Sequence, residues 1–179
     1  MRFIIAAAVV ALLSAAPARA EVASASANGF VIEAEAEVAT TPERAWRALT
    51  QLGRWWGGEH TYSGEGRRMQ VDVRAGGCWC ERWGNGQSVE HGRVVLAMER
   101  EGVRTLRFNA ALGPLQELAV NGVLTFTVAP HADGAKITMI YRVSGDPGLN
   151  LAQMAPLVDM VLTEQFGRLS RYSASGSPD

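Results

Sequence analysis

Two glutamates on a predicted hairpin are the first candidates for chemistry in this chain. The dipeptide Asn85-Gly86 favours a two-residue turn between antiparallel strands. That turn would place Glu81 directly opposite Glu90 on the more apolar face of the hairpin. Like charges at this separation repel, so one of the two pKa values should rise. The pair could then anchor the polar end of a ligand or act as general acid and base. The alternative is a bulge or strand end that exposes one glutamate to water.

Two cysteines and a histidine are expected on the other face of the same hairpin. The predicted turn places Cys80 opposite His91, with Cys78 one step along the strand. Residues i and i+2 of a strand have Cα atoms roughly 6.5–7 Å apart, at the upper limit for a disulfide. Two half-buried thiols are therefore expected, and a strained, redox-active disulfide is the first alternative. A metal site of Cys78, Cys80 and His91 is the second, although Arg82 and Arg93 nearby oppose a dication.

Periodicity predicts the elements that position these residues. Apolar residues alternate with glutamates over residues 30–38, which predicts a half-buried strand. Thr41-Pro42-Glu43 is a typical helix start, and alternating segments between residues 69 and 143 predict a series of antiparallel strands. Apolar residues then recur every three or four positions from about residue 155 to 172, which predicts a long amphipathic helix.

The N-terminus has the pattern of a secretory signal peptide. Met1-Arg2 is followed by an apolar run over residues 3–13 and then by Ala18-Arg19-Ala20. We expect cleavage after Ala20, a flexible leader at residues 21–28, a single domain at residues 29–172 and a disordered tail at residues 173–179. A buried N-terminal helix is the alternative reading of the first segment. No later apolar run is long enough to span a bilayer, so the mature chain is expected to be periplasmic or secreted, without an integral membrane segment.

The overall composition excludes several classes of protein. The 179 residues include 17 lysines and arginines and 18 aspartates and glutamates, and 47% of all residues are hydrophobic. This balance is that of a globular protein and not of a disordered chain or a coiled coil. A near-even charge also argues against a nucleic acid as partner.

The order of the predicted elements resembles that of a known superfamily. A strand, a helical segment, antiparallel strands and a long C-terminal helix can bury their apolar surfaces if a curved sheet wraps around the last helix. This order resembles the SRPBCC, or START-like, superfamily, and the resemblance covers about residues 30–172. The segments TTPERAWRALT, RWWGG, AGGCWCERW, EHGRVV, LGPLQ and LVDMVLTEQFGRL resemble an exported proteobacterial group near its polyketide-cyclase-like and heat-shock-ATPase-activator-like branches. The implied fold is the α+β helix grip.

That resemblance implies a binding function. The expected ligand is a small hydrophobic or lipid-like molecule in a cavity between the sheet and the C-terminal helix, with Glu81 at its polar end and no cofactor. The alternative is a cyclase-like or dehydrase-like enzyme in which Glu81 or Glu90 moves a proton. Activation of a heat-shock ATPase is disfavoured for an exported protein. Trp55 and Trp56, which precede a Gly-Gly pair, would suit a lid at the cavity mouth. The full set of expected ligand-binding residues is Trp55, Trp56, Trp79, Glu81, Trp83, Glu90, Phe108, Leu115, Phe126, Tyr141, Val158, Val161 and Phe166.

Overall fold

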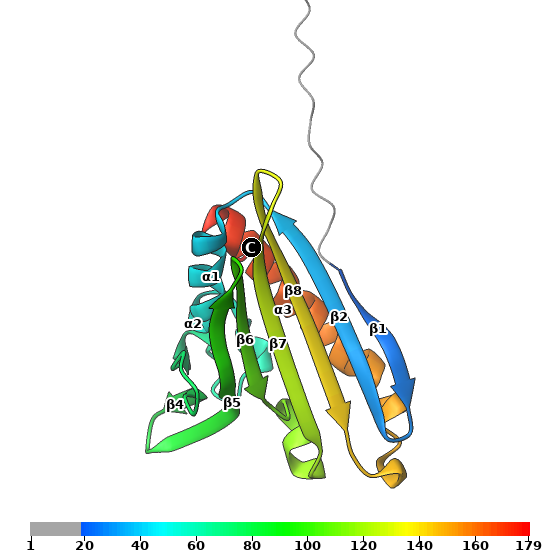
Figure 1. Ribbon diagram of the computed structural model, residues 1–179. Coiled ribbons are helices and arrows are strands. Elements are labelled where there is room, and N and C mark those ends of the chain that lie inside the picture. The colour runs from blue at the N-terminus through cyan, green and yellow to red at the C-terminus, as the bar shows by residue number, and fades with distance from the viewer. Residues whose placement is uncertain (1–18) are drawn as a thin grey trace, which may run out of the picture.

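An antiparallel sheet of eight strands curves around one long helix in this protein (Figure 1). The structure, a computed structural model, describes residues 19–179. The strand order across the sheet is β1-β2-β8-β7-β6-β5-β4-β3, so β1 and β3 are its two edges. The strands span Arg19–Ser26 (β1), Gly29–Val38 (β2), Met69–Val71 (β3), Cys78–Trp83 (β4), Gln87–Arg100 (β5), Val103–Asn109 (β6), Asn121–His131 (β7) and Gly134–Ser144 (β8).

The helix α3 (Ala155–Ser175) lies behind the sheet in Figure 1 and crosses several of its strands. It packs against β1 and β2 and against α1. This arrangement confirms the predicted α+β helix-grip fold. Within the described part of the chain, no helix is both long and apolar enough to cross a membrane. The remaining helices are α1 (Pro42–Thr50), α2 (Leu52–Trp55), and the 3₁₀ turns η1 (Gly58–His60), η2 (Gly66–Arg68), η3 (Gly113–Leu118), η4 (Pro147–Leu149) and η5 (Leu151–Gln153).

Alternation along the strands explains how the sheet encloses α3. In β2 the buried Phe30 and Ile32 alternate with more exposed residues such as Glu33. The neighbouring strands repeat this pattern and bury Phe126 of β7 and Tyr141 of β8. The inner face of the sheet is therefore apolar, and its apolar side chains pack together with those of α3.

The helix start predicted at Thr41 is confirmed. The Thr41 hydroxyl accepts a hydrogen bond from the backbone N–H of Arg44 at 3.3 Å, and Pro42 occupies the first turn, where its missing N–H costs nothing. The helix then buries Ala45 and Leu49 against the rest of the core. A capped helix therefore precedes the segment with Trp55.

The expected flexible leader at residues 21–28 is wrong. Residues Arg19–Ser26 form strand β1, in which Glu21 pairs with Glu33 and Ala25 pairs with Phe30. The alanines and serines of this segment have low strand propensity, but pairing satisfies the backbone groups of β2 that would otherwise form an open edge. The predicted signal peptide covers residues 1–20, and residues 1–18 lie outside the described residues.

The expected disordered tail also begins too early. Helix α3 continues to Ser175 and ends at Gly176, whose φ of 84° is the left-handed conformation that closes many helices. The chain end then folds back onto the helix, where Arg168 Nη1 lies 2.8 Å from Asp179 Oδ1 and Arg171 Nε donates to the carbonyl of Pro178.

Candidate functional site

The hairpin between β4 and β5 has a three-residue loop in place of the expected two-residue turn. Trp83 pairs with Gln87, which leaves residues 84–86 in the loop. Asn85 and Gly86 both have positive φ, at 63° and 74°. An Asn-Gly pair is compatible with short hairpin loops of either length, and the extra residue shifts the pairing by one.

A β-bulge then restores the original register within β5. Cys80 pairs with Glu90 but Trp79 pairs with Gly92, so His91 is the additional residue. The predicted Glu81–Glu90 pair and the predicted Cys80–His91 pair are therefore both wrong. The physical reason is that a shift of one residue exchanges the two faces of a strand, which turns His91 inward and Glu90 outward.

The bulge is accommodated by a glycine at its end. A Cβ atom on Gly92 would lie 2.7 Å from the Cβ atom of Ala110 and 3.1 Å from the carbonyl oxygen of Asn109. The two chains approach closely at this point because Gly92 has no side chain. The position after the bulge therefore has no room for a side chain, and the bulged residue His91 lies beside Glu81.

Glu81 and His91 form a buried polar pair inside the protein. The side chain of Glu81 is 0% exposed and that of His91 is 5% exposed, and Oε2 lies 3.0 Å from Nε2. Two backbone N–H groups also donate to the same carboxylate, from Tyr62 to Oε2 at 3.1 Å and from Ser63 to Oε1 at 2.6 Å. The carboxylate therefore has three donors although water does not reach it.

These contacts determine the protonation of the pair. Burial raises the pKa of Glu81, but the hydrogen bonds from Ser63, Tyr62 and His91 outweigh burial and hold this pKa below its ordinary value. Burial lowers the pKa of His91, and the neighbouring Glu81 only partly opposes this effect. At neutral pH the pair is thus a carboxylate and a neutral imidazole, whose Nε2–H donates to Glu81 and whose Nδ1 keeps its lone pair.

Aromatic rings surround the imidazole. The ring of Trp79 lies 5.6 Å from that of His91, and the ring of Tyr62 lies 5.9 Å from it. Trp56 contacts Trp79 edge to face at 5.0 Å. Trp55 and Trp56 are both buried, and their indole N–H groups donate to backbone carbonyls, so they form part of the packed wall and not an exposed lid.

The remaining residues of the expected ligand site fall into three groups. Most are fully buried in the core between the sheet and α3, and the hydroxyl of one of them, Tyr141, bridges Ala110 O and Leu112 N. Burial raises the pKa of that hydroxyl, which stays neutral. Val158 and Val161 are half-buried on α3. Trp83 lies next to the hairpin loop, and Glu90 lies on the outer face. The core group is Trp79, Phe108, Leu115, Phe126, Tyr141 and Phe166.

The surface formed by residues 19–179 includes a pocket of about 590 Å³ and another of about 380 Å³. The first lies between the α1–α2 junction and β3, and the second lies along β1, β2, β7 and β8. Neither is lined by Glu81 or His91. Side chains next to this pair, such as Trp79 and Phe108, are themselves buried and in contact with each other.

Gln165 of α3 is a polar core residue that the sequence analysis did not select. Its Oε1 accepts a hydrogen bond from the backbone N–H of Gly57 at 2.7 Å, while its Nε2 is buried without a hydrogen-bond partner among the described residues. The adjacent Glu164 contacts His60 at 3.2 Å. The available signal was a glutamine within the apolar stripe of the helix, but its partner lies 108 residues away in the chain.

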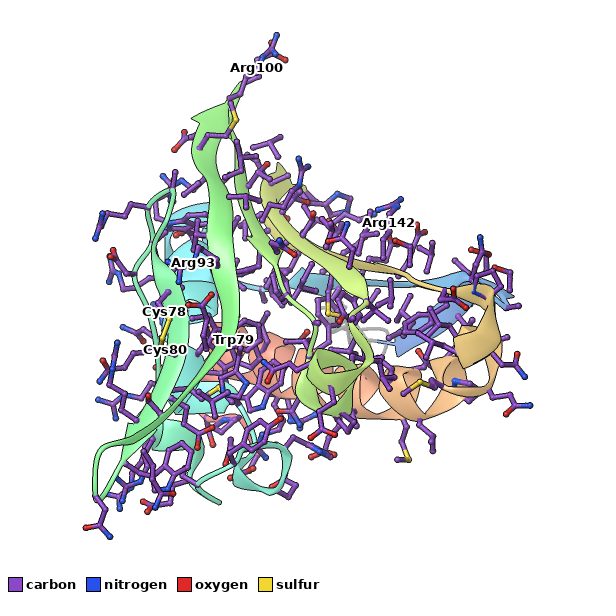
Figure 2. The ribbon with its side chains drawn as sticks, turned by 90° about the horizontal axis from the view of Figure 1, so that it is seen from below. Cys78, Trp79, Cys80, Arg93, Arg100 and Arg142 are labelled. Carbon is purple, nitrogen blue, oxygen red and sulfur yellow. A yellow bond between two sulfur atoms is a disulfide. The ribbon has the colours of Figure 1, made fainter. Side chains whose placement is uncertain are left out.

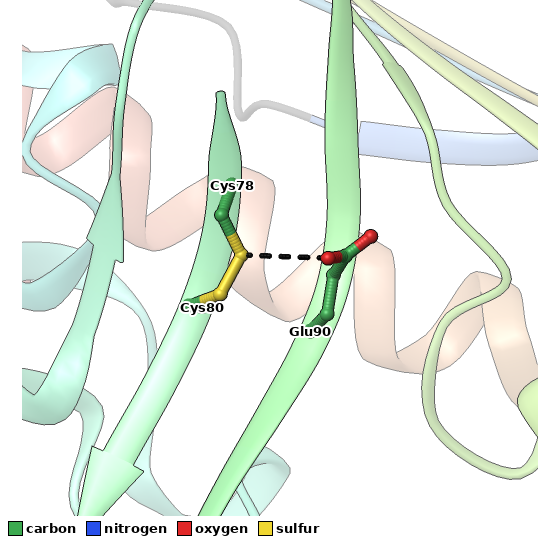
Figure 3. Close-up of side chains that lie close together, drawn as sticks. All are labelled: Cys78, Cys80 and Glu90. Carbon is green, nitrogen blue, oxygen red and sulfur yellow. Dashed lines mark hydrogen bonds between the residues drawn. A yellow bond between two sulfur atoms is a disulfide. The ribbon is translucent and has the colours of Figure 1, made fainter. Parts of the chain in front are cut away.

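Cys78 and Cys80 form a disulfide, so the expectation of two thiols is wrong. Their Cα atoms are 5.4 Å apart, closer than in a regular strand and within the range of a disulfide. The expected metal ligand His91 is held by Glu81 and not by the sulfurs. The residue near the disulfide is Glu90 and not His91: Glu90 Oε2 lies 3.8 Å from Cys78 Sγ (Figure 3).

The sequence matches no known family profile and no curated protein. Solved structures, however, share the fold. CalU16 from Micromonospora echinospora superposes with a TM-score of 0.51 at 16% identity, over 84% of this chain and 78% of CalU16. A protein from Rhodobacter sphaeroides gives a TM-score of 0.51 at 20% identity, over 85% of this chain and 96% of its own.

A conserved protein of unknown function from Enterococcus faecalis also has a TM-score of 0.51, at 11% identity, over 83% of this chain and 74% of that chain. At these low identities the similarity shows a shared fold, and the chemistry of each protein depends on the residues of its own site. The curved antiparallel sheet, the long C-terminal helix and these structural neighbours together show that the chain has the α+β helix-grip fold.

Proposed function

We propose that this protein binds a small, mostly hydrophobic molecule between the sheet and α3, with Glu81 and His91 at the polar end. The observation that carries the proposal is the buried Glu81–His91 pair set among aromatic rings. Sites for small molecules are mostly apolar and contain a few convergent polar groups, and this arrangement has that character. A carboxylate and an imidazole acceptor suit a ligand that carries a hydroxyl or amide group.

One further feature supports binding at this place. Gln165 has a buried Nε2 with an unused hydrogen-bonding capacity within the described chain, which a ligand oxygen would satisfy. Because Glu81 and His91 are buried, a ligand reaches them only if core side chains or residues 57–65 move, and Glu81 and Gln165 hold residues 57–65 through hydrogen bonds.

We also propose that binding takes place outside the cytoplasm, because residues 1–20 have the pattern of a signal peptide. A chain cut after Ala20 would still contain Glu21, the third residue of β1, and every pair of that strand with β2 from Glu21–Glu33 onward.

The binding proposal is tested by extracting purified full-length protein with organic solvent and identifying released molecules by mass spectrometry. Binding of a fluorescent hydrophobic probe, anilinonaphthalene sulfonate, is then followed in the extracted protein through tryptophan quenching. We expect Glu81→Gln to change the affinity at least about fivefold, since a charge at the polar end is removed. The matched control is Glu35→Gln, the same change at an exposed position of β2. No extractable molecule and equal probe binding by both variants would contradict the proposal.

The neutral imidazole favours a second candidate function at the same place, which is proton transfer. Glu81 orients His91 through Nε2, and among residues 19–179 no hydrogen bond to Nδ1 is found, so Nδ1 is available as a base. The dyad replaces the Glu81–Glu90 pair expected from the sequence. A test uses nitrobenzisoxazole, whose ring opens when a base removes a carbon-bound proton. Ring opening that is lost in His91→Gln but kept in His131→Gln would support an enzyme; equal rates would exclude His91 as the base.

A further inference from the structure

We propose that the Cys78–Cys80 disulfide is a thiol–disulfide exchange site that accepts two electrons from dithiols. The bond lies on β4, next to the edge strand β3, on the face opposite to Trp79 and Glu81. Figure 2 shows the two cysteines together on this strand, with Arg93 close to them. Neither Glu81 nor His91 takes part in this exchange, so its test is independent of the proposed ligand binding.

The bond contributes little to holding the chain together. Only Trp79 separates the two cysteines, and the stabilisation that a disulfide provides through the unfolded chain grows with the length of the loop it closes. Strand β4 is already held on both sides, by β3 through pairs such as Cys80–Gln70 and by β5 through pairs such as Cys78–Arg93. Opening the disulfide therefore leaves the sheet intact, which is a requirement for reversible exchange.

The two sulfur-bearing residues differ in access, and this difference gives the exchange a direction. Cys78 is half-buried, and Cys80 is less exposed, at 8%. An incoming thiolate therefore reaches Sγ of Cys78, and Cys80 is the leaving group.

The charges around Cys78 favour this chemistry. Its cross-strand partner is Arg93, whose Nε donates to Glu90 Oε1 at 3.1 Å and whose Nη1 donates to the carbonyl of Gly76 at 2.9 Å. The guanidinium compensates the charge of Glu90, so an anionic thiolate can approach. After reduction, the thiol of Cys78 lies within reach of Glu90 Oε2, which can accept its proton in a hydrogen bond (Figure 3). A contact that stabilises the reduced form makes the disulfide a better oxidant.

The reaction balances with a dithiol as reductant. A thiolate of the dithiol attacks Sγ of Cys78, which forms a mixed disulfide, and the Cys80 sulfur leaves as a thiolate and takes up a proton. The second thiol of the reductant loses its proton and attacks its own sulfur in the mixed disulfide, which releases Cys78 as a thiolate that is then protonated. Two electrons and two protons pass to the protein, and the dithiol becomes a disulfide. Exchange with oxidised glutathione reverses the process.

The first test uses the unaltered full chain in the absence of denaturant. The protein is incubated with dithiothreitol, the thiols are trapped with iodoacetamide, and the intact mass is measured while circular dichroism follows the fold. We expect two labelled cysteines with an unchanged spectrum, and the disulfide should return after addition of oxidised glutathione. A bond that resists reduction until the protein unfolds, or cysteines that are unpaired after exposure to oxidised glutathione, would overturn the proposal.

The second test examines the direction of attack. Cys80→Ser leaves the half-buried Cys78 as the only thiol, and Cys78→Ser leaves the buried Cys80. With a chromogenic aromatic disulfide as probe, the Cys80→Ser variant should react at least about tenfold faster, because access governs the rate. Equal rates, or faster reaction of Cys80, would overturn the assignment of Cys78 as the attacked sulfur. If either variant fails to fold, the first test still decides whether the disulfide exchanges.

Discussion

The Glu81 carboxylate is ionised inside the protein because three N–H donors replace the water that it loses. Its imidazole partner is neutral for the opposite reason, since burial of His91 disfavours the charged ring more than Glu81 favours it. The two residues therefore respond to acid in the same direction. Each has a pKa below its ordinary value in the folded protein, so the unfolded chain binds protons first.

We predict a loss of stability on acidification that starts near pH 6.5, the ordinary pKa of a histidine. Below that pH the unfolded chain binds a proton at position 91 and the folded protein does not, so the free energy of unfolding should fall by about 1.4 kcal/mol per pH unit until the folded pKa is reached. Ionised Glu81 contributes stability that is present above pH 4.5 and is lost as the pH falls through its lowered folded pKa. Urea unfolding between pH 4 and pH 8 measures both effects.

In the variant His91→Gln, the free energy of unfolding should no longer fall as the pH drops below about 6.5. The loss of stability below pH 4.5, which comes from Glu81, should remain. His131→Gln provides a matched control, because His131 lies at the exposed end of β7 beside Glu37. A slope that is unchanged in His91→Gln would show that His91 is not buried in its neutral form.

Among the elements of the fold, the side chain of Glu81 on β4 holds residues 61–65, a segment with little regular structure. Residues 61–65 follow the short turn η1 and contribute the amides of Tyr62 and Ser63 to Glu81. On the other side, Gly57 donates to Gln165 of α3. Residues 57–65 thus connect β4 to the C-terminal helix through polar contacts.

We predict that Glu81→Gln releases this segment locally. A neutral amide accepts fewer hydrogen bonds and places an NH₂ group where an acceptor is needed, so the amides of Tyr62 and Ser63 should exchange with solvent about 10–100 times faster. Hydrogen exchange followed by NMR measures both amides. Glu35→Gln should leave their exchange unchanged, and the same protection in both variants would contradict the role given to Glu81.

The bulge in β5 permits a second test at this scale, on backbone packing. We predict that Gly92→Ala destabilises the protein by about 1–3 kcal/mol, because the added methyl group would overlap Ala110. Gly84→Ala is the control: no atom lies within 4 Å of its added Cβ, and the change should stay within about 0.5 kcal/mol. Urea unfolding compares the two variants, and equal stabilities would mean that the approach of β5 and β6 at Gly92 is not tight.

For the whole molecule, the proposed export depends on the signal-peptide pattern of residues 1–20. We predict that the chain expressed from its first residue in a Gram-negative host is recovered from the periplasm with Glu21 at its N-terminus. The measurement is the intact mass of the periplasmic protein. Recovery of the full-length chain from the cytoplasm would contradict the export proposal and leave ligand binding to be judged separately.

Much of the fold could be predicted because its determinants are local. The alternation in β2, the capped start at Thr41 and the apolar stripe of α3 each require only neighbouring residues, and each was confirmed. Strand β1 could not be predicted in the same way, because it depends on a partner strand and not on its own residues. Its residues have little strand propensity, and β1 is held by the open edge of β2.

By itself the sequence determined that a curved sheet surrounds a C-terminal helix, and it singled out Glu81, His91 and the two cysteines as chemically notable residues. Only the tertiary structure decided which of them meet. One extra loop residue and the bulge at His91 exchange the faces of two neighbouring side chains, so Glu81 gains an imidazole and the disulfide gains Glu90. The physical reason is that strand faces alternate with every residue, so a shift of one position leaves the composition of the hairpin unchanged but changes its chemistry.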